Sequence, residues 1–441
     1  MNIKSKVFII VILISFSFGY DLYSQLYEWT EQNSGVTSQL TSVWGVTRDV
    51  AWICGYNGTV LRTTNRGMNW LNVSGNGIPS NISLVNICGI DSNSALTSGY
   101  MASNSFVYKT TNAGANWSQT FTQINGFINA IWMLNATNGF MEGNPVEGRW
   151  SLWNTSNAGT NWDSAGLFLQ QAGNETGWNN SLLICGYEPN YKILFGTNNS
   201  GIYFSSNFGS SWLIRSTIPE QNTYSIFFYP GFTGDGLAGG STLIKTTDYG
   251  ANWYEVGSLG TGNFGGITSN AFMPQNSPWL LRIWYIRNDN KIYYSFFDGT
   301  NWEVQYTASS GSYKHINYLG LSNGNSIWAV RDNGGISFLY LNFNAVRKIS
   351  DVVPDGFSLS QNYPNPFNST TNIGFHLPKS SLVKLTIFDI LGREIDRFTF
   401  LSLIPGMYEV NIDASNYFSG VYFYELKAST YSATKKMILI K

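Results

Sequence analysis

Short apolar runs separated by glycines and polar turn residues fill most of the chain between residues 26 and 348. Residues 40–46, 50–55 and 59–63 are typical: they are rich in aromatic and β-branched side chains, and glycine separates them. Runs of this length and composition predict β-strands joined by tight turns. Abundant glycine and aromatic residues likewise argue against helix bundles and coiled coils.

One eight-residue turn recurs six times and divides this region into similar segments. The copies, called boxes below, occupy residues 63–70, 110–117, 155–162, 205–212, 246–253 and 295–302, and each ends in Trp. Successive tryptophans are 47, 45, 50, 41 and 49 residues apart. Four strands of about six residues with their turns need roughly 45 residues, the length of one propeller blade. The spacing therefore predicts about seven blades, six of which carry a box.

Each box position has a readable physical purpose. An Asn or Asp side chain can bond backbone N–H groups across the turn, and a Ser or Thr at the first position adds a second internal hydrogen bond. Glycine supplies a positive φ, and the Trp ring packs against the neighbouring repeat. We expect the following box residues to be structural: Asn65, Gly67, Trp70, Asn112, Gly114, Trp117, Asn157, Gly159, Trp162, Asn207, Gly209, Trp212, Asp248, Gly250, Trp253, Asp298, Gly299 and Trp302. The sixth box departs from the pattern, because Phe297 stands where the others have Asn or Asp.

The seventh blade has no box of its own. Residues 316–343 carry its strand pattern, with 328–330 and 336–338 as the middle strands. Residues 27–29 look like an outer strand without a blade. We expect this strand to pair with the last blade and close the ring, which hides edges that would otherwise aggregate.

The pattern changes after residue 348. Residues 349–356 are predicted to be a linker, and the strand-like runs 383–389, 407–412, 420–427 and 434–440 follow. Pro364 and Pro366 force extended or turn backbone before them. The predicted fold is therefore all-β: a seven-bladed β-propeller over residues 25–348, then a small antiparallel β-sandwich over residues 357–441.

The first 24 residues have the pattern of a secretory signal peptide. Lys4 and Lys6 precede the apolar segment 7–18, which is too short to span a bilayer. Cleavage after Gly19 or after Ser24 fits this pattern. No later segment reaches 18 apolar residues, so we expect the mature protein to have no transmembrane segment.

Charge and cysteine content exclude several classes of function. Only 12% of residues are charged, and 25 basic side chains balance 26 acidic ones, so we expect no nucleic-acid partner. The three cysteines lie in Ile-Cys-Gly triplets and are expected to be buried small hydrophobes. Two histidines, neither beside a cysteine, leave no zinc site of the usual kind. We expect no metal, no cofactor and a monomer.

The boxes resemble the Asp-box of the BNR-repeat and sialidase-like propellers, Ser/Thr-x-Asp/Asn-x-Gly-x-x-Trp. Together with the glycine-terminated second strand before each box, as in residues 53–62, they also resemble the photosystem II assembly-factor-like propellers. The first resemblance implies that each box is a structural turn that lies away from the active face of the propeller. The second implies a scaffold that holds partners.

Residues 357–441 resemble the type A C-terminal sorting domain of the type IX (Por) secretion system. The matching stretches are 362–368 (NYPNPFN), 388–393 (FDILGR), 414–416 with 419–424, and 435–437. The resemblance implies that the type IX machinery of a Bacteroidota-type Gram-negative bacterium is a partner. It also implies export to the cell surface or the medium, with removal of the domain.

Loops that join the second and third strands of each blade should lie opposite the boxes, beside the central channel. The loop 142–149 is the longest and has a local charge cluster, which makes it the best candidate site. The simpler interpretation is that Glu142, Glu147 and Arg149 are solvated loop charges. The candidate ligand-binding residues are Tyr56, Tyr100, Glu142, Glu147, Arg149, Trp150, Asp289, Arg331 and Asp332.

Two function classes remain open at this stage. The first is a secreted, non-catalytic binding or scaffold protein for a glycan or a protein, with no catalytic residue. The alternative is a glycoside hydrolase, sialidase-like or other, that acts on extracellular polysaccharide. That alternative needs a carboxylate pair about 5 to 9 Å apart in an open channel mouth, drawn from Glu142, Glu147, Asp289 and Asp332. The early Arg-Ile-Pro motif of sialidases is absent.

Overall fold

The computed structural model describes residues 29–186, 190–217, 222–229, 234–270, 282–296, 298–321, 324–341, 346–350, 352–414 and 417–441. Contacts divide the chain into two units, one of which is Trp29–Leu339 while the other includes Tyr340–Lys441. The predicted signal peptide, residues 1–24, lies outside the described residues. Within the described ranges the regular elements are all strands, and no helix is long and apolar enough to cross a bilayer.

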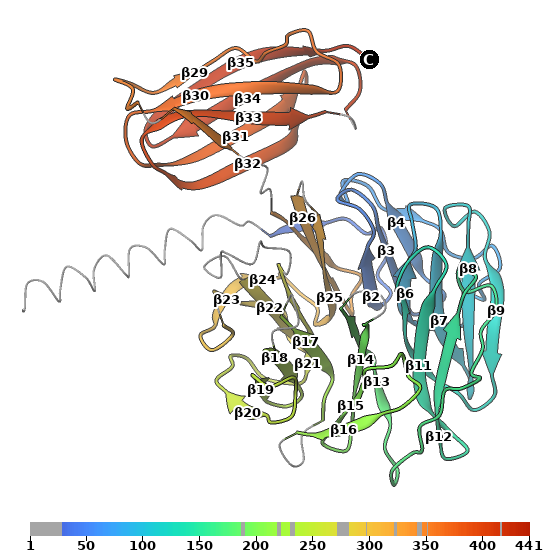
Figure 1. Ribbon diagram of the computed structural model, residues 1–441. Coiled ribbons are helices and arrows are strands. Elements are labelled where there is room, and N and C mark those ends of the chain that lie inside the picture. The colour runs from blue at the N-terminus through green and yellow to red at the C-terminus, as the bar shows by residue number, and fades with distance from the viewer. Residues whose placement is uncertain are drawn as a thin grey trace, which may run out of the picture. The chain divides into compact units, whose positions relative to one another are not determined.

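Seven antiparallel sheets follow one another along the described part of Trp29–Leu339 (Figure 1). The first three blades are β2 (Leu40–Gly45), β3 (Ala51–Gly55), β4 (Val60–Thr63), β5 (Leu71–Asn72); β6 (Ser83–Gly89), β7 (Ala95–Met101), β8 (Asn104–Thr110), β9 (Ser118–Gln123); and β10 (Ile128–Met133), β11 (Gly139–Val146), β12 (Arg149–Thr155). The third blade has three strands, and two isolated bridges, Arg149 with Gln170 and Asn154 with Asp163, take the place of a fourth.

The remaining four blades complete the unit. They are β13 (Gly177–Cys185), β14 (Lys192–Thr197), β15 (Gly201–Ser205), β16 (Leu213–Ser216); β17 (Ser225–Phe228), β18 (Gly236–Gly239), β19 (Leu243–Thr246), β20 (Tyr254–Val256); β21 (Phe264–Ser269), β22 (Arg282–Arg287), β23 (Lys291–Phe296), β24 (Glu303–Thr307); and β25 (Tyr313–Leu321), β26 (Gly324–Arg331), β27 (Ile336–Leu341), β1 (Thr30–Gln32). The first strand of each blade contacts the first strand of the next, and β25 contacts β2. The ring is therefore closed, and the predicted seven-bladed propeller is confirmed.

The first and last parts of this unit meet in one sheet. β1 pairs antiparallel with β27, and Glu31 lies opposite Ser337. The strand begins at Thr30, just after the predicted segment 27–29, of which Tyr27 and Glu28 lie outside the described residues. Arg331, nearly buried, donates hydrogen bonds to the Glu31 carboxylate. The expected closure of the ring is thus present, with an ion pair beside it.

Large apolar interfaces join neighbouring blades. Trp52 and Val60 of the first blade pack with Leu84 and Tyr108 of the second, and Trp117 of the second box lies edge-on to Trp52 at 6.1 Å between ring centroids. This is the packing of a box Trp against the neighbouring repeat that the sequence indicated. Cys54 and Cys88 are buried as expected, whereas Cys185 is only half-buried.

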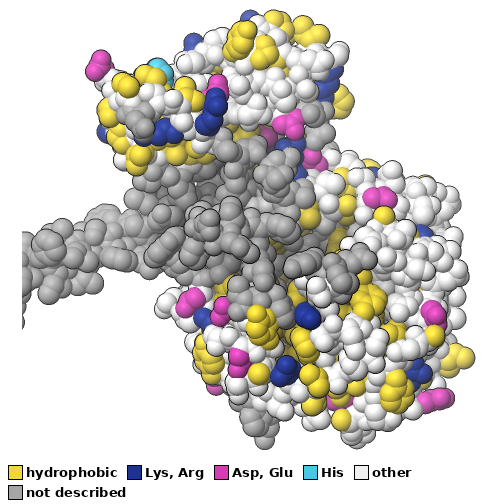
Figure 2. All heavy atoms as spheres, viewed as in Figure 1, with side chains coloured by type: hydrophobic (Ala, Val, Ile, Leu, Met, Phe, Trp, Pro, Cys, Tyr) yellow, Lys and Arg dark blue, Asp and Glu magenta, His cyan; other side chains and the backbone are white. Residues whose placement is uncertain are grey.

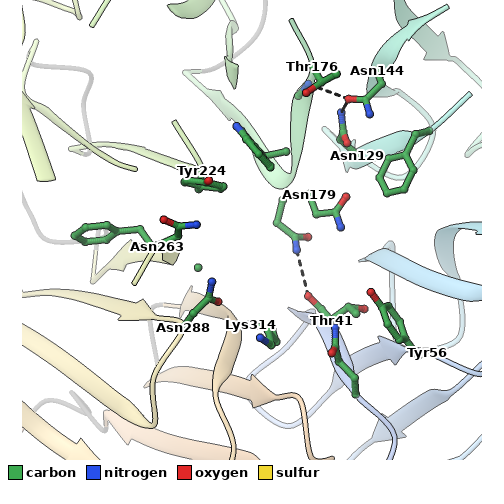
Figure 3. Close-up of a pocket in the computed structure, with 17 residues that line it drawn as sticks. Thr41, Tyr56, Asn129, Asn144, Thr176, Asn179, Tyr224, Asn263, Asn288 and Lys314 are labelled. Atoms are coloured by element: carbon green, nitrogen blue, oxygen red, sulfur yellow. Dashed lines mark hydrogen bonds between the residues drawn. The ribbon is translucent and has the colours of Figure 1, made fainter. Parts of the chain in front are cut away.

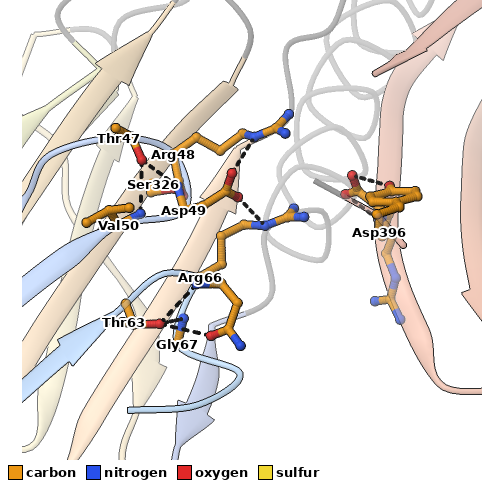
Figure 4. Close-up of polar contacts among 12 residues, drawn as sticks. Thr47, Arg48, Asp49, Val50, Thr63, Arg66, Gly67, Ser326 and Asp396 are labelled. Atoms are coloured by element: carbon orange, nitrogen blue, oxygen red, sulfur yellow. Dashed lines mark hydrogen bonds and ion pairs between the residues drawn. The ribbon is translucent and has the colours of Figure 1, made fainter. Parts of the chain in front are cut away.

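The boxes form the same hydrogen-bonded turn in the first five blades. In the first, Thr63 Oγ1 accepts a hydrogen bond from the Gly67 N–H at 2.9 Å (Figure 4). Asn65 Oδ1 accepts one from the Asn69 N–H at 3.0 Å. Gly67 has φ +79°, and Arg66 before it also has a positive φ of 58°. The sequence indicated the first positive φ and missed the second. Arg66 Nε lies 3.0 Å from Asp49 Oδ1, and this ion pair links the box to the turn between β2 and β3.

The other unit is a β-sandwich of two four-stranded sheets. Their strand orders are β28 (Arg347–Ser350), β33 (Gly406–Asp413), β30 (Thr370–Leu377), β29 (Ser358–Leu359), and β32 (Glu394–Leu403), β31 (Ser381–Asp389), β34 (Gly420–Ala428), β35 (Tyr431–Leu439). Aromatic and aliphatic side chains from both sheets, among them Phe375, Ile387 and Tyr424, form its core. The sequence assigned residues 347–350 to the end of the propeller and to the linker. In the structure these residues form β28, which belongs to the sandwich because it pairs with β33.

The segment 362–368 is held against this sandwich by specific hydrogen bonds. The Asn362 side chain donates to the Pro364 carbonyl and to Thr371 Oγ1, both at 3.0 Å. The side-chain oxygen Oδ1 of Asn365 accepts a hydrogen bond from the Ile438 N–H at 2.9 Å. The recurrent asparagines and prolines of this stretch therefore fix how the chain enters the sandwich.

Candidate functional site

A cavity of about 400 Å³ lies at one mouth of the propeller channel (Figure 3). Six of the seven blades contribute to it, and the second blade does not. Its lining residues are Gln39, Thr41, Tyr56, Phe127, Asn129, Asn144, Thr176, Gly177, Trp178, Asn179, Asn180, Tyr224, Asn263, Phe264, Gly265, Asn288 and Lys314. Tyr56 and Asn288 come from loops between second and third strands, so the cavity is on the face opposite the boxes.

Carboxamides dominate the polar groups of this cavity. Seven of the lining residues are Asn or Gln, one is Lys, and none is acidic. A carboxamide both donates and accepts hydrogen bonds and carries no charge. The cavity therefore offers many neutral hydrogen-bonding groups at the place where propellers commonly hold ligands.

A bulge in β13 forms the floor. The pairing of β13 with β14 shifts register between Gly177 and Leu182, and Asn180 within this bulge has φ +61°. The Asn180 amide donates to the Thr41 carbonyl (3.2 Å), and its oxygen accepts from Ser42 Oγ (3.0 Å) and Asn86 Nδ2 (2.8 Å). The fourth blade is thereby linked across the channel to the first and second blades.

Two further amides make the wall beside this floor rigid. Asn144 Oδ1 accepts hydrogen bonds from Asn129 Nδ2 (3.0 Å) and from the Gly177 N–H (2.9 Å). A Cβ at position 177 would lie 2.5 Å from Asn129 Nδ2 and 2.8 Å from Glu142 Oε1, so glycine is required there. This wall is fixed before any ligand arrives.

Three other amides are available to a ligand. Asn179, Asn263 and Asn288 line the cavity, and their side chains make no hydrogen bond to another described residue (Figure 3). Asn179 and Asn288 are exposed and Asn263 is half-buried. Because each amide keeps its full donor and acceptor capacity, together they can bind a polar ligand directly.

Aromatic side chains lie on two sides of the cavity. Trp178 and Tyr224 pack with ring centroids 4.2 Å apart on the side of the fourth and fifth blades. On the side of the first three blades, the ring centroids of Phe127 and Tyr100 are 4.9 Å apart. Tyr56 also contacts Tyr100 on this side. Burial, with a smaller effect of Tyr100, raises the pKa of Tyr56, so its hydroxyl stays protonated at neutral pH.

The cavity carries little net charge. Lys314 is its one cation among the described lining residues, and its Nζ lies 3.4 Å from Asp332 Oδ2. On the face of the propeller that Figure 2 shows, charged side chains are likewise scattered rather than gathered. An anionic ligand would have to compete with Asp332 for Lys314.

Of the nine candidate residues, the structure brings four to this region. Tyr56 lines the cavity, and three others contact lining residues: Tyr100 contacts Phe127, Glu142 accepts a hydrogen bond from Asn129, and Asp332 pairs with Lys314. Asp289 is engaged elsewhere, because its Oδ2 accepts from the Tyr293 hydroxyl at 2.6 Å. Arg331 pairs with Glu31 in the last blade, as described above.

The charged segment 142–149 is not the site that the sequence suggested. Glu147 is exposed at the turn between β11 and β12, and Arg149 donates to the Leu167 carbonyl at 2.5 Å and lies over the Phe168 ring. Trp150 is 1% exposed and packs between the third and fourth blades. The segment contributes Asn144 to the cavity and none of its charged groups.

Glu142 was expected to be a solvated loop charge, and that expectation is wrong. β11 continues through Val146, which places Glu142 inside the strand with 0% exposure. Asn129 Nδ2 donates to its Oε1 at 3.0 Å, while Oε2 is buried without a hydrogen bond. Burial raises the pKa of Glu142 to about 8, so the carboxyl is mostly protonated at neutral pH.

A tyrosine–glutamate pair does occur, buried behind the residues that line the cavity. The Tyr203 hydroxyl donates to Glu175 Oε1 at 2.5 Å, and the Trp150 indole N–H donates to the same oxygen at 2.9 Å. Tyr203 and Glu175 are 5% and 2% exposed. A substrate in the channel mouth would not reach this pair, which binds neighbouring blades together.

The sequence reasoning missed Asn129, Asn179, Asn263 and Tyr224. These residues lie in or just before the first strand of their blades, whereas the sequence-based candidates came from the region of the loops between second and third strands. A usable signal was present: asparagine or an aromatic residue recurs near the start of the first strand in several blades. The bulge that brings Asn179 into the channel has no comparable signal.

Comparison with known proteins identifies the tail and the fold. Residues 361–441 match the family model described as a secretion system C-terminal sorting domain. Among curated proteins, none matches the chain. The Por-type tail indicates that the protein is exported by the type IX secretion system to the cell surface or the extracellular space.

Solved structures resemble the propeller at low identity. The structure "YCF48 bound to D1 peptide" has a TM-score of 0.54 and 16% identity, covering 72% of this chain and 97% of that one. YCF48 from Cyanidioschyzon merolae has a TM-score of 0.52 and 15% identity, covering 71% and 98%. The WD40 propeller domain of Doa1 has a TM-score of 0.52 and 13% identity, covering 71% and 97%. These similarities establish the propeller fold.

Proposed function

We propose that the exported propeller is a non-catalytic binding protein whose ligand occupies the channel mouth. One observation carries the proposal: Asn179, Asn263 and Asn288 line a preformed cavity, and their side-chain amides have no hydrogen-bonding partner among the described residues. Polar groups that face a rigid, partly aromatic cavity in this way are typical of ligand sites. The sorting tail brings the protein to the surface, where such a ligand would be met.

The acidic groups support binding over hydrolysis. Hydrolysis of a glycosidic bond uses two carboxyl groups that flank the bond. The four acidic candidates are dispersed: Glu142 is buried in β11, Glu147 is at a turn tip, Asp289 bonds Tyr293, and Asp332 pairs with Lys314. The described lining residues include no acid.

The neighbouring fold is consistent with a binding role. One solved relative in fold, YCF48, is described as bound to a D1 peptide. We infer by analogy that a propeller of this shape is suited to holding a partner, with its own lining residues deciding which. The propeller then acts as the functional unit, and residues 357–441 serve export.

The test is binding of the purified protein to an array that carries both defined oligosaccharides and defined peptides. We expect retention on some of these probes, and loss of that retention in Asn179→Trp, which fills the cavity. Asn93→Trp is the matched control, because Asn93 is exposed in the β6–β7 turn on the box face. Equal retention of Asn179→Trp and wild type, or release of reducing sugar from the oligosaccharides, would contradict the proposal.

A further inference from the structure

At the channel mouth several backbone carbonyls are already hydrogen-bonded, while three side-chain amides are available to a ligand. At four places a carbonyl just before a blade's first strand accepts an N–H from the end of the second strand of the same blade or from the loop that follows it. The pairs are Gln39 with Tyr56 (2.9 Å), Phe127 with Asn144 (2.8 Å), Thr176 with Asn198 (3.1 Å) and Asn263 with Asn288 (3.0 Å). An extended peptide that adds to a sheet edge needs unpaired backbone groups. These rim carbonyls are already paired.

The available amides suit hydroxyl groups. A sugar hydroxyl donates one hydrogen bond and accepts others, and a carboxamide does both through neighbouring atoms. Asn179, Asn263 and Asn288 come from three different segments, so they can reach several hydroxyls of one ligand. Asn144 is bonded to Asn129 and to the Gly177 N–H, and these contacts hold the wall in place.

The aromatic groups suit the apolar faces of sugar rings. The C–H groups of a pyranose face are apolar and pack on aromatic rings, while the ring hydroxyls point outward to polar groups. The Trp178–Tyr224 pair and the side chain of Tyr56 lie on opposite sides of the cavity, with Asn179 between them (Figure 3). A glycan in the cavity would therefore meet aromatic side chains on two sides and amides between them.

The charge pattern selects among glycans. An acidic sugar needs a free cation, and Lys314 lies 3.4 Å from Asp332. An amino sugar with a free amine needs an acid, and the described lining residues contain none. We propose that the channel mouth binds a neutral glycan, an inference that rests on the proposed binding function and names its ligand class.

The experiment measures affinity of the full exported chain for three soluble probe sets: neutral cello-, manno- and xylo-oligosaccharides, acidic oligoalginate, and a defined peptide library. We expect binding to a neutral oligosaccharide that does not weaken as salt is added, since no ion pair forms. The double substitution Asn263→Ala with Asn288→Ala should weaken it about tenfold or more. Asn93→Ala, an exposed amide on the box face, should leave it unchanged.

The possible outcomes distinguish the neutral-glycan inference from the more general proposal that the channel mouth binds a ligand. Binding only to peptides or only to oligoalginate, with loss in Asn179→Trp, overturns the neutral glycan and leaves the binding function standing. Binding to none of the three sets contradicts both. Neutral-glycan binding that survives the double substitution and Asn179→Trp places the site elsewhere and also overturns the inference. Thermal unfolding of each variant shows that it is folded.

Discussion

Glu142 shows how a single residue can be misjudged from its sequence neighbours. The segment 142–149 contains Glu, Pro and Arg, and these types are typical of a solvated loop. In the structure Glu142 is buried beside Asn129, and its carboxyl is held mainly in the neutral form. A buried neutral acid makes stability depend on pH, because the unfolded chain would ionise it.

Glu142→Gln tests this state directly. The folded pKa of about 8 lies above the ordinary value of 4.5, so the folded state binds more protons between these values and stability falls as pH rises through that window. Gln keeps the shape of the neutral acid without ionising. We expect the variant to match wild type near pH 5 and to exceed it by about 2–4 kcal/mol near pH 8.

The measurement is urea unfolding of both proteins at the two pH values. A control comparison is Glu147→Gln, since Glu147 is exposed at a turn. If the free energy of unfolding changes equally in wild type and Glu142→Gln between pH 5 and pH 8, then Glu142 is ionised in the folded protein and the account of this residue is wrong.

At the scale of elements, the boxes and the β13 bulge differ in how far they depend on distant parts of the chain. A box is closed by hydrogen bonds within five residues, as between Thr63 and Gly67, so its turn follows from local sequence. The bulge is fixed by Asn180 bonding Ser42 and Asn86, which lie 138 and 94 residues away. Local patterns could therefore predict the blades, and they could not predict the floor of the cavity.

Asn180→Ala should destabilise the propeller by about 1–3 kcal/mol. The substitution removes three hydrogen bonds that cross the channel and leaves the groups around Asn86 and Thr41 without their partner. Asn179→Ala is the matched control: it removes an exposed neighbouring amide without a hydrogen bond and should change stability by less than about 0.5 kcal/mol. Denaturant unfolding of the two variants compares them, and equal stabilities would refute the cross-channel link.

At the scale of the whole molecule, repetition made most of the fold predictable. Six tryptophans at blade spacing indicated the ring, and the tail was readable by its own motifs. The third blade was harder, because after Trp162 the bridges at Asp163 and Gln170 replace a fourth strand. The tail's first strand, β28, was missed because its partner β33 lies far along the chain.

Ring closure joins residues 300 positions apart and can be weakened at one side chain. The pKa of Glu31 lies below its ordinary value. Burial alone would raise this pKa, but hydrogen bonds from Arg331 and Tyr306 outweigh the effect of burial. Glu31→Gln leaves the nearly buried Arg331 without its counter-charge. We expect a loss of about 1–3 kcal/mol, allowing for the partial exposure of Glu31.

Differential scanning calorimetry measures this loss. Glu147→Gln serves as a comparison, because Glu147 is an exposed acid at the turn between β11 and β12. A melting temperature for Glu31→Gln equal to that of wild type would mean that the ion pair contributes nothing to closing the ring.

Hydrogen–deuterium exchange of the intact protein, with and without a bound neutral oligosaccharide, locates the binding surface directly. Exchange should slow in peptides that cover residues 176–180 and 263–265, and should stay the same in the box turns on the opposite face. Slower exchange in the box turns or the outer strands, with none at the channel mouth, would contradict the account.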